Sequence, residues 1–186
     1  MIKAVFLDRD GVLIENRAEY VREWAHVEIF EEAAAACRRL SEAGYLLLMV
    51  TNQSAIGRGI LTYNEVKAIN DRVIGEFALR GADIEAAYIC PHAPDEACDC
   101  RKPLPGMLLQ GAREHRVDLS KSFMIGDAGT DMEAADAAGA VGIMVRTGRG
   151  RTQEAKLSAE NRLVWEVVED LQAATDMILG IPKGAI

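Results

Sequence analysis

The chain has little that would mark a membrane, secreted or nucleic-acid-binding protein. No apolar stretch approaches the roughly 20 residues that cross a bilayer. The N-terminus lacks the basic, apolar and small-residue order of a signal peptide, because Asp8 and Asp10 interrupt it. With a formal net charge of −8, the chain has no basic field to attract nucleic acid or an anionic membrane. We therefore expect a cytoplasmic protein with reduced cysteines and neither nucleic-acid nor membrane partners.

The sequence also lacks internal repeats, low-complexity segments and interdomain linkers. A length of 186 residues with 49% hydrophobic content suits one domain with a substantial core. We assign that domain to residues 1–180 and a short tail to residues 181–186. No stretch has the character of an obvious interface, so we expect a monomer.

Apolar runs that alternate with helical patterns predict an α/β fold with a parallel sheet and helices on both faces. Strands are expected at 4–7, 45–50, 84–89, 122–125 and 141–145, with an edge strand within 162–168. Helices are expected at 30–43, 62–80, 106–115, 132–138 and 170–179. A loop or hairpin is expected at 14–29, and loops at 55–61, 93–105 and 147–161. Thr62 and Glu65 predict a capping box at the second helix. The segment between the first two strands is too short for a separate cap domain.

Polar side chains gather where three of these strands end. They are Asp8 with Asp10, Thr51 with Asn52, and Asp127 with Asp131. In a doubly wound sheet the carboxyl ends of the strands lie side by side and bind ligands. Four carboxylates at one crevice repel one another unless a cation lies between them. Oxygen ligands of this kind favour Mg²⁺ together with a substrate phosphate.

These residue types suit phosphoryl transfer. A carboxylate can attack phosphorus and form an aspartyl-phosphate, which suggests Asp8 or a neighbour as nucleophile. A second carboxylate two residues away, Asp10, can protonate the leaving oxygen and then activate water. A hydroxyl and a lysine would neutralise charge on the phosphoryl oxygens, and Thr51 and Lys102 are the candidates.

The chain resembles the haloacid dehalogenase (HAD) phosphatase superfamily in four ordered motifs. They are Asp8-Arg9-Asp10-Gly11-Val12, Thr51-Asn52-Gln53-Ser54, Arg101-Lys102-Pro103 and Gly126-Asp127 with Asp131. The resemblance implies a Rossmann-like fold, with Asp8 as nucleophile, Asp10 as general acid and base, and Thr51 and Lys102 holding the phosphoryl group. It also implies Mg²⁺ bound by Asp8, the Asp10 carbonyl and Asp127, with Asp131 orienting the metal's surroundings. From the residues alone, Asp131 could instead be a carboxylate stabilised at a helix N-terminus.

A second cluster contains Cys90, His92, Cys98 and Cys100. Three thiols and an imidazole are a common structural zinc set, and four protein ligands leave no open position for catalysis. A disulfide or a chance cluster is the alternative, and a reducing cytosol disfavours the disulfide. We expect zinc to pin this loop and to fix Arg101 and Lys102, which follow the last ligand.

The cysteine cluster and the Arg101-Lys102-Pro103 segment resemble the D-glycero-D-manno-heptose 1,7-bisphosphate 7-phosphatases and the closely similar histidinol-phosphatases. That resemblance implies a small phosphorylated sugar as substrate, with Arg101 recognising its second phosphate or the sugar. The expected substrate contacts are Arg17, Glu19, Tyr20, Asn52, Gln53, Ser54, Arg58 and Arg101. Three departures bear on the substrate: Ala55 replaces a common glycine, Ala128 replaces a lysine of some members, and the 92–98 loop is short.

Other functions remain open from the sequence. Histidinol phosphate is the alternative substrate, although an arginine-rich pocket favours a bisphosphate on charge grounds. A receiver-type phospho-accepting domain also has acidic strand ends, but Asp10 is placed to promote hydrolysis. A zinc-dependent nucleic-acid binder or DNA-end phosphatase is disfavoured by the acidic charge and the lack of an aromatic-basic stripe.

Overall fold

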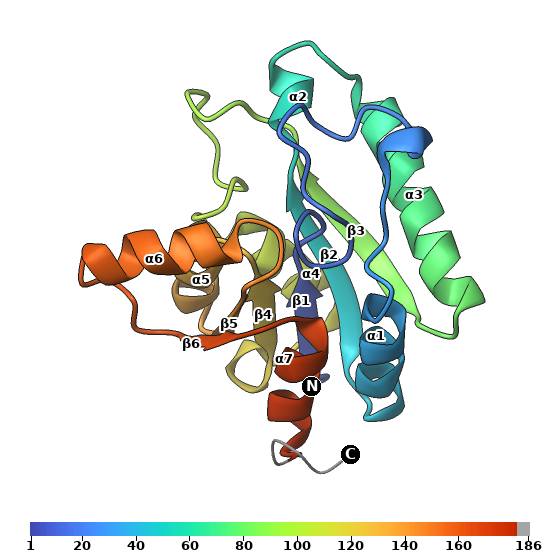
Figure 1. Ribbon diagram of the computed structural model, residues 1–186. Coiled ribbons are helices and arrows are strands. Elements are labelled where there is room, and N and C mark those ends of the chain that lie inside the picture. The colour runs from blue at the N-terminus through green and yellow to red at the C-terminus, as the bar shows by residue number, and fades with distance from the viewer. Residues whose placement is uncertain (182–186) are drawn as a thin grey trace.

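The architecture is a parallel sheet sandwiched between helices. It is seen in a computed structural model that describes residues 1–181 (Figure 1). The sheet has six strands in the order β3-β2-β1-β4-β5-β6, and every pairing is parallel. The strands are β1 (Ala4–Leu7), β2 (Leu46–Asn52), β3 (Ile84–Cys90), β4 (Phe123–Gly126), β5 (Val141–Val145) and β6 (Glu166–Val168). The predicted edge strand is thus confirmed as β6, which forms one edge of the sheet.

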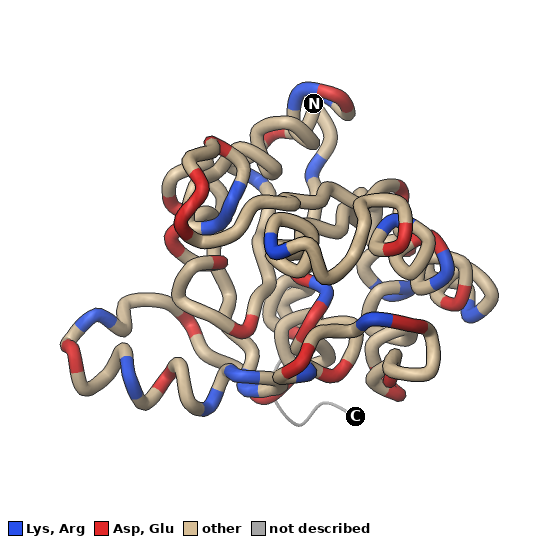
Figure 2. The backbone as a smooth tube through the Cα atoms, turned by 90° about the horizontal axis from the view of Figure 1, so that it is seen from above, with Lys and Arg blue, Asp and Glu red and all other residues tan. Residues whose placement is uncertain are grey.

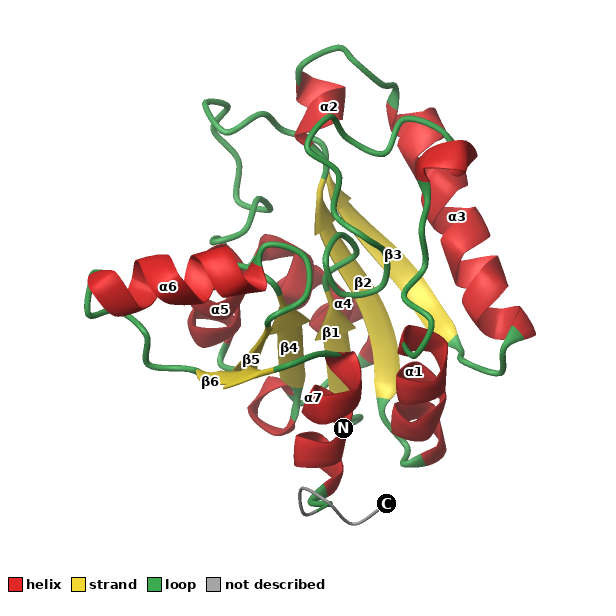
Figure 3. Cartoon of the chain, viewed as in Figure 1, coloured by secondary structure: helices red, strands yellow, loops and turns green. Residues whose placement is uncertain are grey.

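Helices cover both faces of the sheet, as Figure 3 shows by colour. They are α1 (Ala33–Glu42), α2 (Ser54–Gly57), α3 (Tyr63–Leu79), α4 (Gly106–His115), α5 (Gly129–Ala138), α6 (Gly150–Ala159) and α7 (Leu171–Leu179), with short 3₁₀ turns at Trp24–His26 and Leu119–Lys121. Because strand side chains alternate, Val5 and Leu7 pack toward α1, α3 and α7. Phe6 packs on the other face, with α4 and α5. The predicted α/β fold with helices on both faces is confirmed.

Local signals account for several helix boundaries. The Thr62 hydroxyl accepts a hydrogen bond from the Glu65 N–H at 3.2 Å, and the Glu65 carboxylate accepts one from the Thr62 N–H at 2.7 Å. This reciprocal pair is the predicted capping box of α3. Gly139 ends α5 in the left-handed conformation that glycine adopts at little cost.

The prediction of a loop over 147–161 is wrong, because α6 occupies most of it. Few of its residues are apolar, and within the helix only Gly150 and Leu157 are buried. Leu157 packs with Met132 of α5 and Met144 of β5, and this contact holds the helix against those two elements. The predicted loop at 55–61 also contains part of α2, and the helix predicted from residue 132 begins at Gly129.

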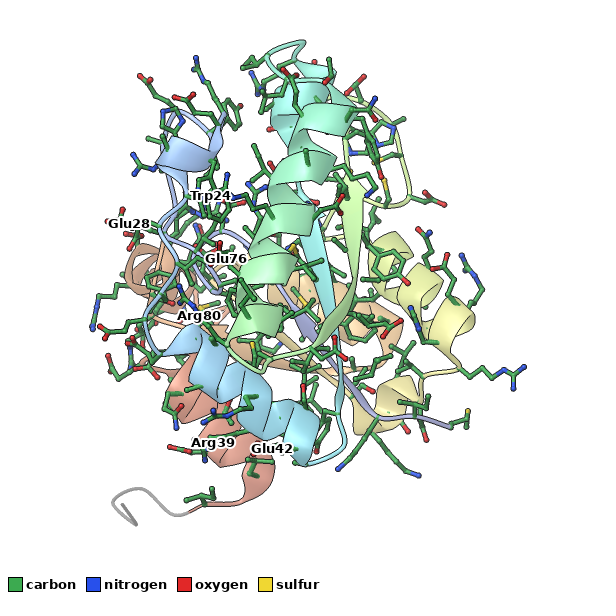
Figure 4. All side chains as sticks on the ribbon, turned by 90° about the vertical axis from the view of Figure 1, so that its right-hand side faces the viewer. Trp24, Glu28, Arg39, Glu42, Glu76 and Arg80 are labelled. Atoms are coloured by element: carbon green, nitrogen blue, oxygen red, sulfur yellow. The ribbon has the colours of Figure 1, made fainter. Side chains whose placement is uncertain are left out.

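The long connection between β1 and α1 crosses the carboxyl edge of the sheet. In Figure 4 its Trp24 lies beside α3, and the Arg72 guanidinium lies 4.0 Å from the centre of the Trp24 ring. This cation–π contact attaches the connection to α3. The predicted loop is confirmed, with one 3₁₀ turn added and no inserted domain among the described residues. No described helix is long and apolar enough to span a bilayer. The residues 182–186 of the expected tail lie outside the described range.

Candidate active site

Asp8 stands directly after β1, the strand at the centre of the ligand-binding edge. Its N–H still donates to the Ile125 carbonyl of β4 at 3.0 Å, so the backbone is fixed as the strand ends. One carboxylate oxygen accepts from the Arg9 N–H at 2.8 Å and lies 3.0 Å from the Lys102 ammonium. The side chain is almost fully buried, but it borders a cavity at this edge.

Asp10 is clamped by two neighbouring side chains. The Arg9 guanidinium donates to both of its carboxylate oxygens, at 3.0 and 3.1 Å, and the Gln53 amide donates to one of them at 2.9 Å. Arg9 is itself 1% exposed and donates to the Asn70 side chain of α3 at 2.9 Å. A charged fork of this kind fixes both the position and the plane of the Asp10 carboxylate.

Lys102 lies between two carboxylates. Its ammonium is 3.0 Å from Asp8 and 2.5 Å from Asp131, and it also donates to the Val50 carbonyl at 3.0 Å. Burial raises the pKa of Asp8 to about 7, although Lys102 opposes this rise. Burial tends to lower the pKa of Lys102, but Asp131 and Asp8 together raise it above its usual value. Lys102 therefore stays charged in the site.

Asp127 is fully buried and is held mainly by Arg149. The Arg149 guanidinium donates to one carboxylate oxygen at 2.9 Å, and the Arg149 N–H donates to the other at 2.8 Å. A Cβ atom at Gly11 or Gly148 would overlap this carboxylate, so glycine is needed for the two loops to approach it. Asp8, Asp127 and Asp131 each place a carboxylate oxygen within 4.8 Å of the others.

Asp131 lies in the first turn of α5 and has two kinds of partner. One of its oxygens accepts from the Ala128 N–H at 3.1 Å, which is the helix N-terminal role left open by the sequence. The other faces Lys102. Burial raises the pKa of Asp131, while Lys102 counteracts that rise.

The four residues of the cysteine cluster also converge. The His92 Nδ1 atom lies 3.5 Å from the Cys90 sulfur and 3.3 Å from the Cys100 sulfur, and the sulfurs of Cys90 and Cys98 are 4.0 Å apart. Bonds of about 2.3 Å to sulfur and 2.0 Å to nitrogen would give tetrahedral edges of about 3.5 to 3.8 Å. The ligand atoms therefore match a zinc site, and the cysteines are not joined as disulfides.

The cluster is linked to the phosphate side of the site. The Arg101 guanidinium donates to the His92 carbonyl at 3.1 Å. The Asn52 side chain donates to the Lys102 carbonyl at 3.0 Å and accepts from the Lys102 N–H at 3.1 Å. Arg101 and Lys102 are therefore held from the cluster on one side and from the end of β2 on the other.

The site opens into a cavity of about 750 Å³. Six of the eight expected substrate contacts line it: Arg17, Tyr20, Asn52, Gln53, Ser54 and Arg101. The other two, Glu19 and Arg58, do not line the cavity. Thr51 is fully buried behind that wall, where its hydroxyl accepts from the Gln53 amide at 2.7 Å. The cavity also borders Asp8, Asp10, Lys102 and Asp131.

Comparison with known proteins identifies the family of this chain. A family model described as HAD-hydrolase-like matches residues 99–174. The D-glycero-beta-D-manno-heptose-1,7-bisphosphate 7-phosphatase of Yersinia pestis is 41% identical over 86% of this chain and 88% of its own length. That of Escherichia coli K12 is 39% identical over 86% and 87%. The chain belongs to the heptose-1,7-bisphosphate phosphatase family.

Solved structures of this phosphatase family share the fold described above. The enzyme from B. bronchiseptica, crystallised with magnesium and phosphate, has a TM-score of 0.89 and 34% identity, over 97% of this chain and 100% of that one. The enzyme from Burkholderia thailandensis has a TM-score of 0.71 and 26% identity, over 95% and 98%. The predicted superfamily and subgroup are thus confirmed.

The donor atoms of this phosphatase suit two different metals. Hard carboxylate oxygens of Asp8, Asp127 and Asp131 at the sheet edge fit Mg²⁺. The thiols and the imidazole fit zinc.

Several residues of the site were not predicted from the sequence. Arg9 holds Asp10 and is itself held by Asn70, and Arg149 and Asn16 contact Asp127, Asn16 at 3.4 Å. Arg149 follows β5, so it could have been found by applying the strand-end argument to the fifth strand as well. Asn70 lies within a helix and gave no such signal.

Proposed function

We propose that this protein is a Mg²⁺-dependent phosphomonoester hydrolase that removes the 7-phosphate of D-glycero-D-manno-heptose 1,7-bisphosphate. The observation that carries the proposal is the meeting of Asp8, Asp127, Asp131 and Lys102 beside one cavity, in a chain about 40% identical to enzymes of that name. The product would be a heptose 1-phosphate, a precursor for surface glycans.

Asp8 is the proposed nucleophile. In the first step one of its carboxylate oxygens bonds to phosphorus, the bond to the sugar oxygen breaks, and an aspartyl-phosphate forms. Lys102, already 3.0 Å from Asp8, would hold the transferred phosphoryl oxygens. Mg²⁺ bound by Asp8, the Asp10 carbonyl and Asp127 would supply further positive charge to these oxygens.

Asp10 is the proposed general acid and then the general base. It would protonate the departing sugar oxygen and later take a proton from the water that cleaves the aspartyl-phosphate. Its clamp by Arg9 and Gln53 supports this role, because proton transfer requires a fixed distance and direction. We propose that the Thr51 hydroxyl, which accepts a hydrogen bond from Gln53, helps to hold the phosphoryl group. Asp131 is proposed to orient the groups around the metal.

Specificity for a bisphosphate would come from the cations around the cavity. Arg101 is proposed to bind the second phosphate, with Arg17 and Tyr20 bordering the sugar. Asn52, Gln53 and Ser54 complete this side of the wall. A protonated histidinol amine would meet the same arginines with unfavourable charge.

The remaining assignments are supporting proposals. Zinc held by Cys90, His92, Cys98 and Cys100 would keep Arg101 and Lys102 in place. Residues 1–180 would act as one cytoplasmic, monomeric phosphatase domain. Basic and acidic positions are interspersed along the described chain in Figure 2, in agreement with a small-molecule substrate and not a nucleic acid.

The test is phosphate release with Mg²⁺ from heptose 1,7-bisphosphate and from histidinol phosphate at equal concentrations. We expect a kcat/KM at least about 100-fold higher for the bisphosphate, since a charged pocket left unpaired rejects a substrate strongly. A preference for histidinol phosphate would refute the substrate assignment, and release from neither would refute the function. Asp8→Asn is the matched control for contaminating phosphatase.

A further inference from the structure

Arg149 separates Asp127 from the substrate cavity. Asp127 is fully buried and does not border the cavity, whereas Arg149 lines it. Atoms of Arg149 reach both carboxylate oxygens: the guanidinium lies 2.9 Å from one, and the N–H lies 2.8 Å from the other. The backbone contact fixes the carboxylate, and the side chain covers its cavity side.

The side chain of Arg149 has room to leave this position. It is 54% exposed, although its partner is fully buried. The opposite side of the Asp127 carboxylate is closed by the backbones at Gly11 and Gly148, where even a Cβ atom would overlap it. The exposed side chain can therefore leave the carboxylate on its cavity side. The N–H of Arg149 would keep its bond to Asp127 if only the side chain turned.

Two cations face the three carboxylates of Asp8, Asp127 and Asp131. Lys102 lies between Asp8 and Asp131, and Arg149 is the cation that faces Asp127. A divalent cation among these three carboxylates would repel a guanidinium that stays on the same oxygen atoms. A phosphate in the cavity would attract that guanidinium, since arginine binds phosphate oxygens with two parallel hydrogen bonds.

We propose that Arg149 is a mobile counter-ion that couples metal binding to phosphate binding. Without metal its side chain neutralises Asp127. When Mg²⁺ binds, the side chain turns into the cavity and donates to the phosphoryl oxygens of the substrate. Arg149 thereby weakens Mg²⁺ binding on its own and strengthens it when phosphate is present. This inference rests on the proposed phosphatase function and adds a residue that positions substrate only in the metal-loaded site.

The test is calorimetric titration of Mg²⁺ into the zinc-containing protein, with and without inorganic phosphate. Arg149→Ala should bind Mg²⁺ at least about fivefold more tightly than wild type without phosphate, the low end of ordinary coupling between sites. Phosphate should tighten Mg²⁺ binding in wild type but change it less than twofold in Arg149→Ala. Arg149→Lys, which keeps the charge without the fork, should lie between them.

Arg151→Ala is the matched control, because Arg151, two residues after Arg149, pairs with the exposed Glu169 and does not line the cavity. It should leave both titrations unchanged. Equal or weaker Mg²⁺ affinity in Arg149→Ala would overturn the proposal, as would a phosphate effect equal to that of wild type. No sugar phosphate is used, so a wrong substrate assignment would leave these results unaffected, and the activity assay described above would reveal it.

Discussion

Replacing Arg9 with methionine should lower both the free energy of unfolding and kcat, and the two losses have different causes. Arg9 is buried and donates to Asp10 and to Asn70, which is fully buried on α3. Loss of charge-assisted hydrogen bonds costs about 1.5–3 kcal/mol, and a buried acceptor left without a donor costs a further 1–3 kcal/mol. Asp10 is 21% exposed and can be partly hydrated, so we expect a total of about 3 kcal/mol.

A second substitution separates the two contributions. In Arg9→Met the Asn70 side chain loses its donor, whereas Arg9→Met with Asn70→Leu replaces both partners by apolar groups, a change that is often nearly neutral. The double variant should therefore regain about 1–2 kcal/mol of the free energy of unfolding. Its turnover should not recover, because Asp10 remains without its clamp. We expect kcat to fall about 100-fold in both variants, the low end for general acid–base catalysis.

Urea unfolding gives the stabilities, and phosphate release at saturating substrate gives kcat. Two results would refute the reasoning. If the double variant is no more stable than Arg9→Met, then the buried Asn70 acceptor is not what the single substitution leaves unpaired. If Arg9→Met keeps the wild-type kcat, then Asp10 does not depend on the guanidinium for its position.

Three further predictions concern the metals, the nucleophile and the substrate. Cys98→Ser should lower both the melting temperature and kcat by disturbing the loop that carries Lys102, and added Zn²⁺ should restore neither; melting curves and zinc content check this. Because the pKa of Asp8 is raised from 3.8 to about 7 by burial, the folded metal-free protein holds a proton there that the unfolded chain loses. Its stability should therefore fall as the pH rises from about 4 to 7, and Asp8→Asn should lack this slope in urea unfolding; a parallel slope would contradict the assignment. Arg101→Ala should raise KM for the bisphosphate about tenfold or more while changing KM for a sugar monophosphate little, and equal effects on both would remove its role at the second phosphate.

Much of the fold follows from short-range patterns. The runs at 4–7 and 141–145 are apolar enough to identify buried strands, and Thr62 with Glu65 marks the start of α3 through contacts three residues apart. The helix α6 was not predicted because most of its residues are polar and its position depends on the contact of Leu157 with two methionines of other elements. A pattern within one segment cannot report such a contact.

The residues of the site also divide into those that local sequence patterns predict and those that depend on contacts between distant segments. Asp8 and Asp127 follow buried strands, so the sequence predicts their meeting. The pairs Arg9–Asn70 and Asp127–Arg149 join residues 61 and 22 positions apart, and each depends on where a loop or helix settles in three dimensions. Arg58 was assigned to the substrate through the family resemblance, but this residue, which directly follows α2, does not line the cavity.

The measurement that tests the central claim most directly is a ³¹P NMR time course of heptose 1,7-bisphosphate with the protein and Mg²⁺. The account predicts that the resonance of the 7-phosphate disappears, inorganic phosphate appears in equal amount, and the 1-phosphate remains. It also predicts no change with Asp8→Asn under the same conditions. Loss of the 1-phosphate, or equal loss of 7-phosphate with Asp8→Asn, would contradict it.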